Sequence, residues 1–210
     1  MSKSPINYSL EPSIICKGKT LQPPAERLVA YFELYKLIQH LDGSIVKCGV
    51  SADEAFSYFS FFKQMGNKKQ PLISFEKDSS VFEEVEIGNE TVLVVKPKNT
   101  VSKQIERIKQ GKNQNIEFLP GALVNSIPDY LMANPELKIA LLTIDLDDYE
   151  NTLTSMQYFY PRLLSGGVLI INNYHKKNGE TLAIKEYFNN GDVFVRHFSC
   201  NKGPHYILKD

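Results

Sequence analysis

Acidic and amide side chains gather in two short stretches of the chain. Asp145, Asp147 and Asp148 follow the apolar run LLTI, and Asn172 and Asn173 follow the apolar run GVLII. Carboxylates in such positions can hold a divalent cation or act as a general base. Asp147 or Asp148 can instead cap a helix that starts near Tyr149. Capping accounts for Asp148, but less well for Asp145, which directly ends an apolar run.

His175 lies three residues after Asn172 and could serve as a base near neutral pH. The alternative is a solvated loop histidine. The other histidines (His40, His197 and His205) have no clustered partners in the sequence and are interpreted as structural.

Glu76 ends the apolar run PLISF. An acid after such a run can accept hydrogen bonds from both hydroxyls of a ribose, and the alternative is a solvated acid beside Lys77.

Upstream, CGVSADEA contains Gly49 but no phosphate-binding GxGxxG. Asp53 and Glu54 begin the next helix, where they disfavour a pyrophosphate. A cofactor with cationic groups and no phosphate, such as S-adenosylmethionine, suits this turn better. The alternative is that Ser51, Asp53 and Glu54 only cap the helix.

Composition excludes several classes of protein. The chain has 210 residues, with 24 Lys+Arg balanced by 24 Asp+Glu. Zero net charge argues against a protein built mainly to bind nucleic acid. No apolar run is long enough to cross a membrane, and the first residues do not form a signal peptide. Three cysteines without a CxxC pair exclude a disulfide framework and favour a cytoplasmic setting.

The elements that must position these residues alternate between strands and helices. Residues 44–50, 71–75, 115–119, 138–144 and 167–171 are predicted strands; residues 26–41, 51–66, 100–111, 122–134, 150–164 and 181–189 are predicted helices, the fourth broken at Pro128. Strands at 193–198 and 205–209 have no helix between them, which predicts an antiparallel pair at a sheet edge. Residues 1–25 are predicted to be an irregular arm, and 26–210 a single domain with a β-hairpin insertion near 81–96 around Gly88-Asn89.

This alternation predicts an α/β fold with a mostly parallel sheet and helices on both faces. Ligands of such sheets bind beyond the carboxyl ends of the strands. Gly49, Glu76, Asp145 and Asn172 all stand at those ends. We therefore expect these four residues to converge on one hollow.

The segment IALLTIDLDDYENTLTSMQYFYPRLLSGGVLIINNYH resembles the macrocin O-methyltransferase (TylF-like) family, whose pattern there is an acidic run ending Y-E-S-T, then Y-P-R-L, G-G and a strand ending D-D-Y. GSIVKCGV, ISFE, FLPGALVNSIPDYL and AIKEYF resemble further family segments. The likeness runs from about Glu26 to the C-terminus. It implies a Rossmann-like class I methyltransferase sheet with an antiparallel final strand, and methylation of sugar hydroxyls from S-adenosylmethionine.

By position, the resemblance implies that Gly49, Val50 and Ser51 line the methionine end of the cofactor. Glu76 would hold the ribose, and Gly121 and Ala122 would lie near the adenine. Asp145, Asn172 and Asn173 would occupy the Mg²⁺ positions of the family, with Asp145 or His175 as the base. Lys47 replaces an acid of the family pattern, and the two asparagines replace aspartates. Amides bring no charge, so we expect weak or absent metal binding.

Three functions follow from these features. The leading hypothesis is an S-adenosylmethionine-dependent O-methyltransferase that acts on a sugar or another small hydroxylated acceptor. The alternative is a catalytically impaired protein of the same fold that serves as a binding or scaffold module. A nicotinamide-dependent oxidoreductase is poorly supported, because the phosphate-binding glycines are missing.

The remaining predictions concern partners. A basic run between Lys96 and Lys112 is either a solvated helix face or a contact for the phosphates of a nucleotide-linked sugar. An aromatic helix with Tyr31, Phe32 and Tyr35 suggests a homodimer. Neither nucleic acid nor membrane is an expected partner.

Overall fold

The computed structural model describes residues 23–49, 54–66, 70–77, 81–87, 90–96, 116–174, 179–189, 193–198 and 203–210. The helices are α1 (Pro23–Ile38), α2 (Glu54–Met65), α4 (Leu123–Ala133), α5 (Tyr149–Phe159), the short 3₁₀ helix η1 (Tyr160–Arg162) and α6 (Gly179–Tyr187). The strands are β1 (Ser44–Gly49), β2 (Leu72–Lys77), β3 (Val81–Ile87), β4 (Glu90–Lys96), β5 (Ile116–Gly121), β6 (Ile139–Asp145), β7 (Leu163–Ile171), β8 (Arg196–His197) and β9 (His205–Leu208).

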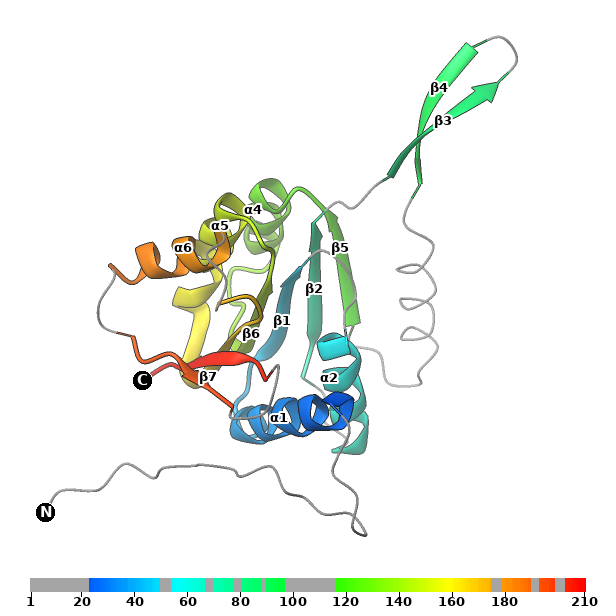
Figure 1. Cartoon of the computed structure of the whole chain (residues 1–210). Coiled ribbons are helices and arrows are strands. Elements are labelled where there is room, and N and C mark those ends of the chain that lie inside the picture. The colour runs from blue at the N-terminus through cyan, green and yellow to red at the C-terminus, as the bar shows by residue number, and fades with distance from the viewer. Residues whose placement is uncertain are drawn as a thin grey trace, which may run out of the picture.

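Seven strands form one sheet in the order β5-β2-β1-β6-β7-β9-β8 (Figure 1). The first five run parallel, β9 is antiparallel to β7, and β8 is antiparallel to β9 at the edge. The predicted antiparallel pair at the edge is therefore confirmed. Strands β1 and β6 lie in the middle of the order, so their carboxyl ends are flanked by neighbours on both sides.

Helices cover both faces of the sheet. One hydrophobic cluster joins α1 and α2 to residues such as Ile45 and Leu141, and a second joins α4, α5 and α6 to residues such as Val46 and Leu142. Because successive strand residues point to opposite faces, the neighbours Ile45 and Val46 enter different clusters. All six residues of β1 are buried, as a strand covered on both faces requires. The predicted α/β architecture is confirmed.

The aromatic side chains of α1 pack against α2. Tyr31 is fully buried and meets Phe59 of α2 edge to face, with ring centroids 5.7 Å apart. Tyr35 is also buried, and Phe32 lies against Phe62 with centroids 5.1 Å apart. These rings anchor α1 on α2, so they no longer supply a reason to expect a homodimer.

Several predicted boundaries are wrong. The strand predicted over residues 193–198 forms only at Arg196–His197, and the strand predicted to begin at residue 167 begins at Leu163. The helix predicted to break at Pro128 is continuous, because Leu123, Ile127 and Leu131 recur on one face and are all buried. The helix predicted through residue 164 instead ends at Phe159. Pro161 has no N–H to continue the α-helical hydrogen bonds, so the chain makes the turn η1 and enters β7 at Leu163.

Strands β3 and β4 pair with each other in a separate two-stranded sheet, from Val81↔Lys96 to Ile87↔Glu90. Figure 1 shows this sheet apart from the main one. Its strands match the predicted hairpin. The Gly88-Asn89 turn, residues 1–22 and the predicted helix 100–111 lie outside the described residues, and α1 begins at Pro23, inside the predicted arm. The division into an arm and a single domain stays a prediction.

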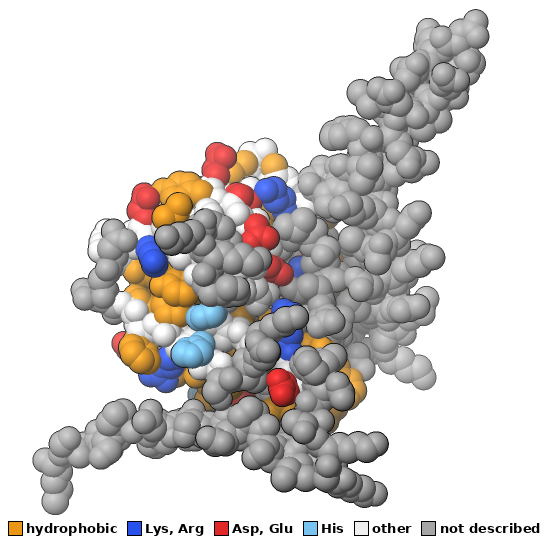
Figure 2. Space-filling model, viewed as in Figure 1, with side chains coloured by type: hydrophobic (Ala, Val, Ile, Leu, Met, Phe, Trp, Pro, Cys, Tyr) orange, Lys and Arg blue, Asp and Glu red, His pale blue; other side chains and the backbone are white. Residues whose placement is uncertain are grey.

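The surface seen in Figure 2 has a mixed character. On its described part, acidic and basic side chains are interspersed with hydrophobic ones. No described helix combines the length and the apolar character needed to span a membrane.

Candidate functional site

The carboxyl ends of the central strands bring the predicted site residues together. Gly49, the last residue of β1, pairs with Glu76 of β2 on one side and with Asp145 of β6 on the other. Asn172 directly follows β7, and its backbone N–H donates to the carbonyl of Ile144 over 3.1 Å. Gly49, Glu76, Asp145 and Asn172 therefore share one edge of the sheet, as the sequence predicts.

The other predicted site residues are placed less centrally or are not described. Gly121 ends β5, opposite Lys77 of β2, and Ala122 is the exposed residue that precedes α4. Gly121 has φ 133°, a conformation that favours glycine. Val50, Ser51 and His175 lie outside the described residues, as does most of the basic run after Lys96.

Glu76 is the most informative residue of this edge. It is 7% exposed, and its Oε1 accepts from the hydroxyl of Ser74 and from Lys47 Nζ at 3.5 Å. Its Oε2 is buried and has no hydrogen-bond partner within the described part of the chain. A buried carboxylate oxygen without a partner is costly, so this atom indicates where a ligand donates a hydrogen bond.

A row of buried polar side chains crosses strands β2, β1 and β6 near their carboxyl ends. Ser74, Lys47 and Thr143 pair side by side across β2, β1 and β6, two residues before Glu76, Gly49 and Asp145. Residues two apart point to the same face, which here is the face covered by α1 and α2. All three are buried, and Thr143 Oγ1 lacks a partner among the described residues. Glu76 Oε2 and Thr143 Oγ1, on the two strands that flank β1, are thus both unsatisfied within the described part of the chain.

Of the residues at the predicted metal positions, Asp145 and Asn173 are hydrogen-bonded to each other and Asn172 is hydrogen-bonded to Tyr31. Asn173 Nδ2 donates to Asp145 Oδ1 over 2.8 Å, and the hydroxyl of Tyr31 donates to Asn172 Oδ1 over 2.8 Å. Mg²⁺ requires several oxygen ligands, whereas Asn173 presents an N–H to the carboxylate. The described residues contain no group of three or more His, Cys, Asp or Glu side chains able to hold a metal. This arrangement does not fit a Mg²⁺ ion.

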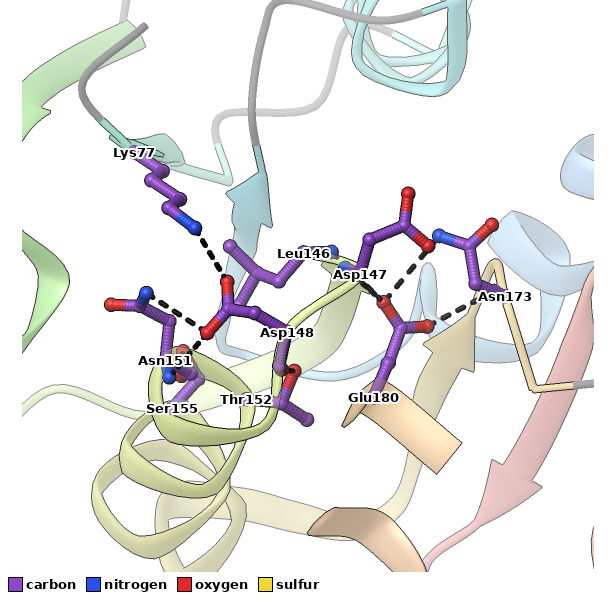
Figure 3. Close-up of polar contacts among 9 residues, drawn as sticks. All are labelled: Lys77, Leu146, Asp147, Asp148, Asn151, Thr152, Ser155, Asn173 and Glu180. Carbon is purple, nitrogen blue, oxygen red and sulfur yellow. Dashed lines mark hydrogen bonds and ion pairs between the residues drawn. The ribbon is translucent and has the colours of Figure 1, made fainter. Parts of the chain in front are cut away.

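Glu180 joins the ends of β6 and β7, and sequence reasoning missed it. One carboxylate oxygen accepts from the N–H groups of Leu146 and Asp147, at 2.8 and 3.2 Å, and the other accepts from the N–H of Asn173 at 3.0 Å (Figure 3). The side chain is fully buried, and burial raises its pKa, although these N–H groups oppose the rise. Glu180 fixes the backbone directly after Asp145 and the backbone after β7. The signal available was an acid at the start of a predicted helix.

Asp148 is the N-cap of α5, as its position predicts. Its Oδ1 accepts from the backbone N–H of Asn151 over 2.9 Å, and its Oδ2 accepts from Lys77 Nζ over 2.7 Å (Figure 3). Asp147 has φ 57°, which turns the chain between Asp145 and the helix. The acidic run thus divides into a site residue, a turn residue and a helix cap.

Two histidines lie further along the same edge. His205 pairs with Ile171, the last residue of β7, and with His197 of β8. The two imidazoles stack with centroids 5.8 Å apart, and Tyr174 lies 5.6 Å from the His205 ring. The interpretation of His197 and His205 as residues without clustered partners is wrong, because only the antiparallel pairing of β8 with β9 brings them together.

The buried acceptor on Glu76 can be compared with the groups that the predicted cofactor carries. S-adenosylmethionine carries a ribose whose hydroxyls can donate hydrogen bonds, and Glu76 Oε2 is a buried acceptor in need of one. At the end of β1 the Lys47 ammonium lies over Gly49, because an added Cβ there would stand 2.7 Å from Lys47 Nζ. The buried acceptor on Glu76 therefore fits the ribose of such a cofactor.

Comparison with known proteins agrees with this fold. The family model described as Macrocin-O-methyltransferase (TylF) matches residues 63–195, which is more than half of the chain. CalS11, a TDP-rhamnose 3'-O-methyltransferase of calicheamicin biosynthesis, matches with a TM-score of 0.68 at 17% identity, over 88% of this chain and 82% of that chain.

Two further solved structures show the same fold. The O-methyltransferase NovP has a TM-score of 0.66 at 18% identity, over 87% of this chain and 79% of that chain. The methyltransferase PaMTH1 of Podospora anserina, solved with S-adenosylhomocysteine (SAH) bound, has a TM-score of 0.53 at 12% identity, over 91% and 84%. The curated protein sequences contain no match.

Proposed function

Because the chain belongs to the macrocin O-methyltransferase family, we propose that it transfers a methyl group from S-adenosylmethionine to a hydroxyl of a sugar or another small hydroxylated acceptor. The observation that carries the cofactor assignment is Oε2 of Glu76 beside Gly49, which is buried and has no hydrogen-bond partner among the residues that the structure describes. CalS11, which shares the fold, acts on a nucleotide-linked sugar, and this supports a sugar as acceptor.

Each residue has a role in this proposal. Glu76 accepts from a ribose hydroxyl, and Gly49, Val50 and Ser51 line the methionine end of the cofactor. Gly121 and Ala122 lie toward the adenine. When bound, S-adenosylmethionine supplies a methyl group activated by its positively charged sulfur. The S–CH3 bond breaks as the new C–O bond forms, and the sulfur is left as a neutral thioether.

Asp145 is the proposed base. Its carboxylate lies at the end of β6, half-buried, and the Nδ2–H of Asn173 fixes its Oδ1. We assign the acceptor's proton to Asp145 Oδ2. His175 remains the second candidate base from the sequence. Catalysis then rests on positioning the acceptor oxygen, and no step requires Mg²⁺.

A catalytically impaired binding module is the second candidate. The observation that favours it is the buried Lys47, which places a cation next to the proposed cofactor site. Under this alternative, the chain binds the nucleoside but transfers no methyl group. The predicted cytoplasmic location, homodimer and absence of nucleic-acid partners stay predictions.

Calorimetric titration with S-adenosylmethionine and with SAH tests the cofactor assignment. We expect both to bind the wild type, and Glu76→Gln to weaken both by about 10- to 100-fold, because a hydrogen bond to a charged group is lost. Glu136→Gln, at an exposed acid in the loop before β6, is the matched control and should bind like the wild type. Absence of binding by the wild type would contradict the cofactor, and full binding by Glu76→Gln would contradict its placement.

Turnover separates the two candidates. We expect methyl transfer to a panel of sugars and nucleotide-linked sugars, with Asp145→Asn lowering kcat roughly 10²- to 10⁴-fold while the affinity for SAH stays near that of the wild type. Release of SAH is the measurement. Binding of the cofactor without turnover on any acceptor would favour the binding module, and a kcat for Asp145→Asn within a few-fold of the wild type would exclude Asp145 as the base.

A further inference from the structure

Lys47 is a cation inside the sheet, at the place where the proposed cofactor binds. Only 2% of the residue is exposed, although it occupies the middle of β1. Its ammonium reaches toward the carboxyl end of the strand, because a Cβ built on Gly49 would stand 2.7 Å from Nζ and 2.9 Å from Cε. The Lys47 head group therefore lies directly over Gly49.

The ammonium also contacts the residue assigned to the ribose. Lys47 Nζ lies 3.5 Å from Glu76 Oε1, and both side chains are less than a tenth exposed. Burying a lysine is expensive, and here the ammonium lies beside a carboxylate oxygen that also accepts from Ser74. A position that served packing alone would be occupied by an apolar residue, as Ile45 and Val46 are on the same strand.

The two forms of the cofactor differ in charge. S-adenosylmethionine has a sulfonium, an ammonium and a carboxylate, so its net charge is +1. SAH has a neutral thioether in place of the sulfonium, and its net charge is zero. A fixed buried cation raises the free energy of the first complex relative to the second, and burial protects this effect from screening by salt.

We propose that Lys47 is a selectivity-determining residue that lowers the affinity of the site for S-adenosylmethionine relative to SAH. This inference rests on the proposed function. Glu76 and Asp145 supply negative charge on either side of Gly49, and Lys47 offsets part of it. The consequence is a site in which the demethylated product competes well with the methyl donor, so that turnover depends on a reaction that consumes this thioether.

The test compares three ligands by calorimetry: S-adenosylmethionine, SAH and 5′-methylthioadenosine. The ratio Kd(S-adenosylmethionine)/Kd(SAH) should fall about tenfold in Lys47→Met, because the repulsion of the sulfonium is removed. Lys47→Arg keeps the cation and should keep the wild-type ratio. 5′-Methylthioadenosine is neutral and has the same ribose, so its Kd reports any change in how Glu76 holds the ribose.

Controls separate the outcomes. Lys138→Met removes an exposed lysine just before β6, at the opposite end of the sheet, and should leave the ratio unchanged. If Lys47→Met does not fold, Lys47→Gln serves for the same measurement, because its amide can still donate to Glu76. A ratio that stays at the wild-type value in the neutral variant, or that falls equally in Lys138→Met, overturns the inference alone. Failure of all three ligands to bind the wild type overturns the proposed function and this inference with it.

Discussion

Two buried polar clusters stand at the same edge of the sheet and differ in how completely the chain satisfies them. In the first, around Lys47 and Glu76, Oε2 of Glu76 and Oγ1 of Thr143 have no partner among the described residues. In the second, both carboxylate oxygens of Glu180 accept hydrogen bonds from backbone N–H groups. Buried polar groups are nearly always paired in folded proteins. The satisfied cluster is therefore scaffolding, and the unsatisfied one is where a ligand completes the hydrogen bonds.

The strongest test of this contrast is the replacement of Glu180. Glu180→Ala leaves the N–H groups of Leu146, Asp147 and Asn173 buried without their acceptor. We expect the free energy of unfolding to fall by about 3–5 kcal/mol, measured by denaturant titration. Thr143→Val is the matched control, because it removes a similarly buried hydroxyl that has no partner in the described part of the chain. It should change stability by about 1 kcal/mol or less. A loss as large in Thr143→Val as in Glu180→Ala would erase the distinction between the clusters.

The pH dependence of stability sharpens the same comparison. Burial raises the pKa of Glu180 above its usual value of 4.5, so the folded state keeps the proton to a higher pH than the unfolded chain does. The contribution of this group to stability is therefore full below pH 4.5 and is lost as the pH rises through the folded pKa. Glu180→Gln cannot titrate. We expect the difference in unfolding free energy, wild type minus Glu180→Gln, to decrease as the pH rises across this window, and an increase would contradict the assignment.

The contrast also explains what could be predicted from the sequence. The strand–helix alternation, the antiparallel pair at the edge and the gathering of Gly49, Glu76, Asp145 and Asn172 follow from apolar runs that end in polar residues, which is a local signal. Glu180 and the His197–His205 stack depend on which segments meet in space, and no local pattern encodes that. The break expected at Pro128 failed because burial of Leu123, Ile127 and Leu131 outweighs the one backbone hydrogen bond that proline removes.

Aspartates in place of Asn172 and Asn173 test whether these positions can hold Mg²⁺ together with Asp145. The side chain of Asn173 donates to Asp145, and its backbone N–H donates to Glu180. In Asn172→Asp/Asn173→Asp, like charges face Asp145, so we expect a loss of about 1–2 kcal/mol that millimolar Mg²⁺ reverses. The melting temperature with and without Mg²⁺ is the measurement, and the wild type should show no Mg²⁺-dependent shift. A double variant that Mg²⁺ does not stabilise would indicate that these side chains do not converge.

The smallest expected effect concerns a second lysine–acid pair at this edge. Lys77 Nζ lies 2.7 Å from Asp148 Oδ2, but the two side chains are 37% and 30% exposed, so water and salt screen their attraction. We expect Lys77→Met to lower the free energy of unfolding by about 0.5 kcal/mol at low salt and by less at 1 M salt. Asp148→Asn removes the opposite charge of the same pair while keeping an N-cap for α5, and its loss should be of similar size to that of Lys77→Met. A loss above about 2 kcal/mol in Lys77→Met, or a loss that 1 M salt leaves unchanged, would show that the Lys77–Asp148 pair behaves like the buried Lys47–Glu76 pair. Burial would then not distinguish Lys47 from Lys77.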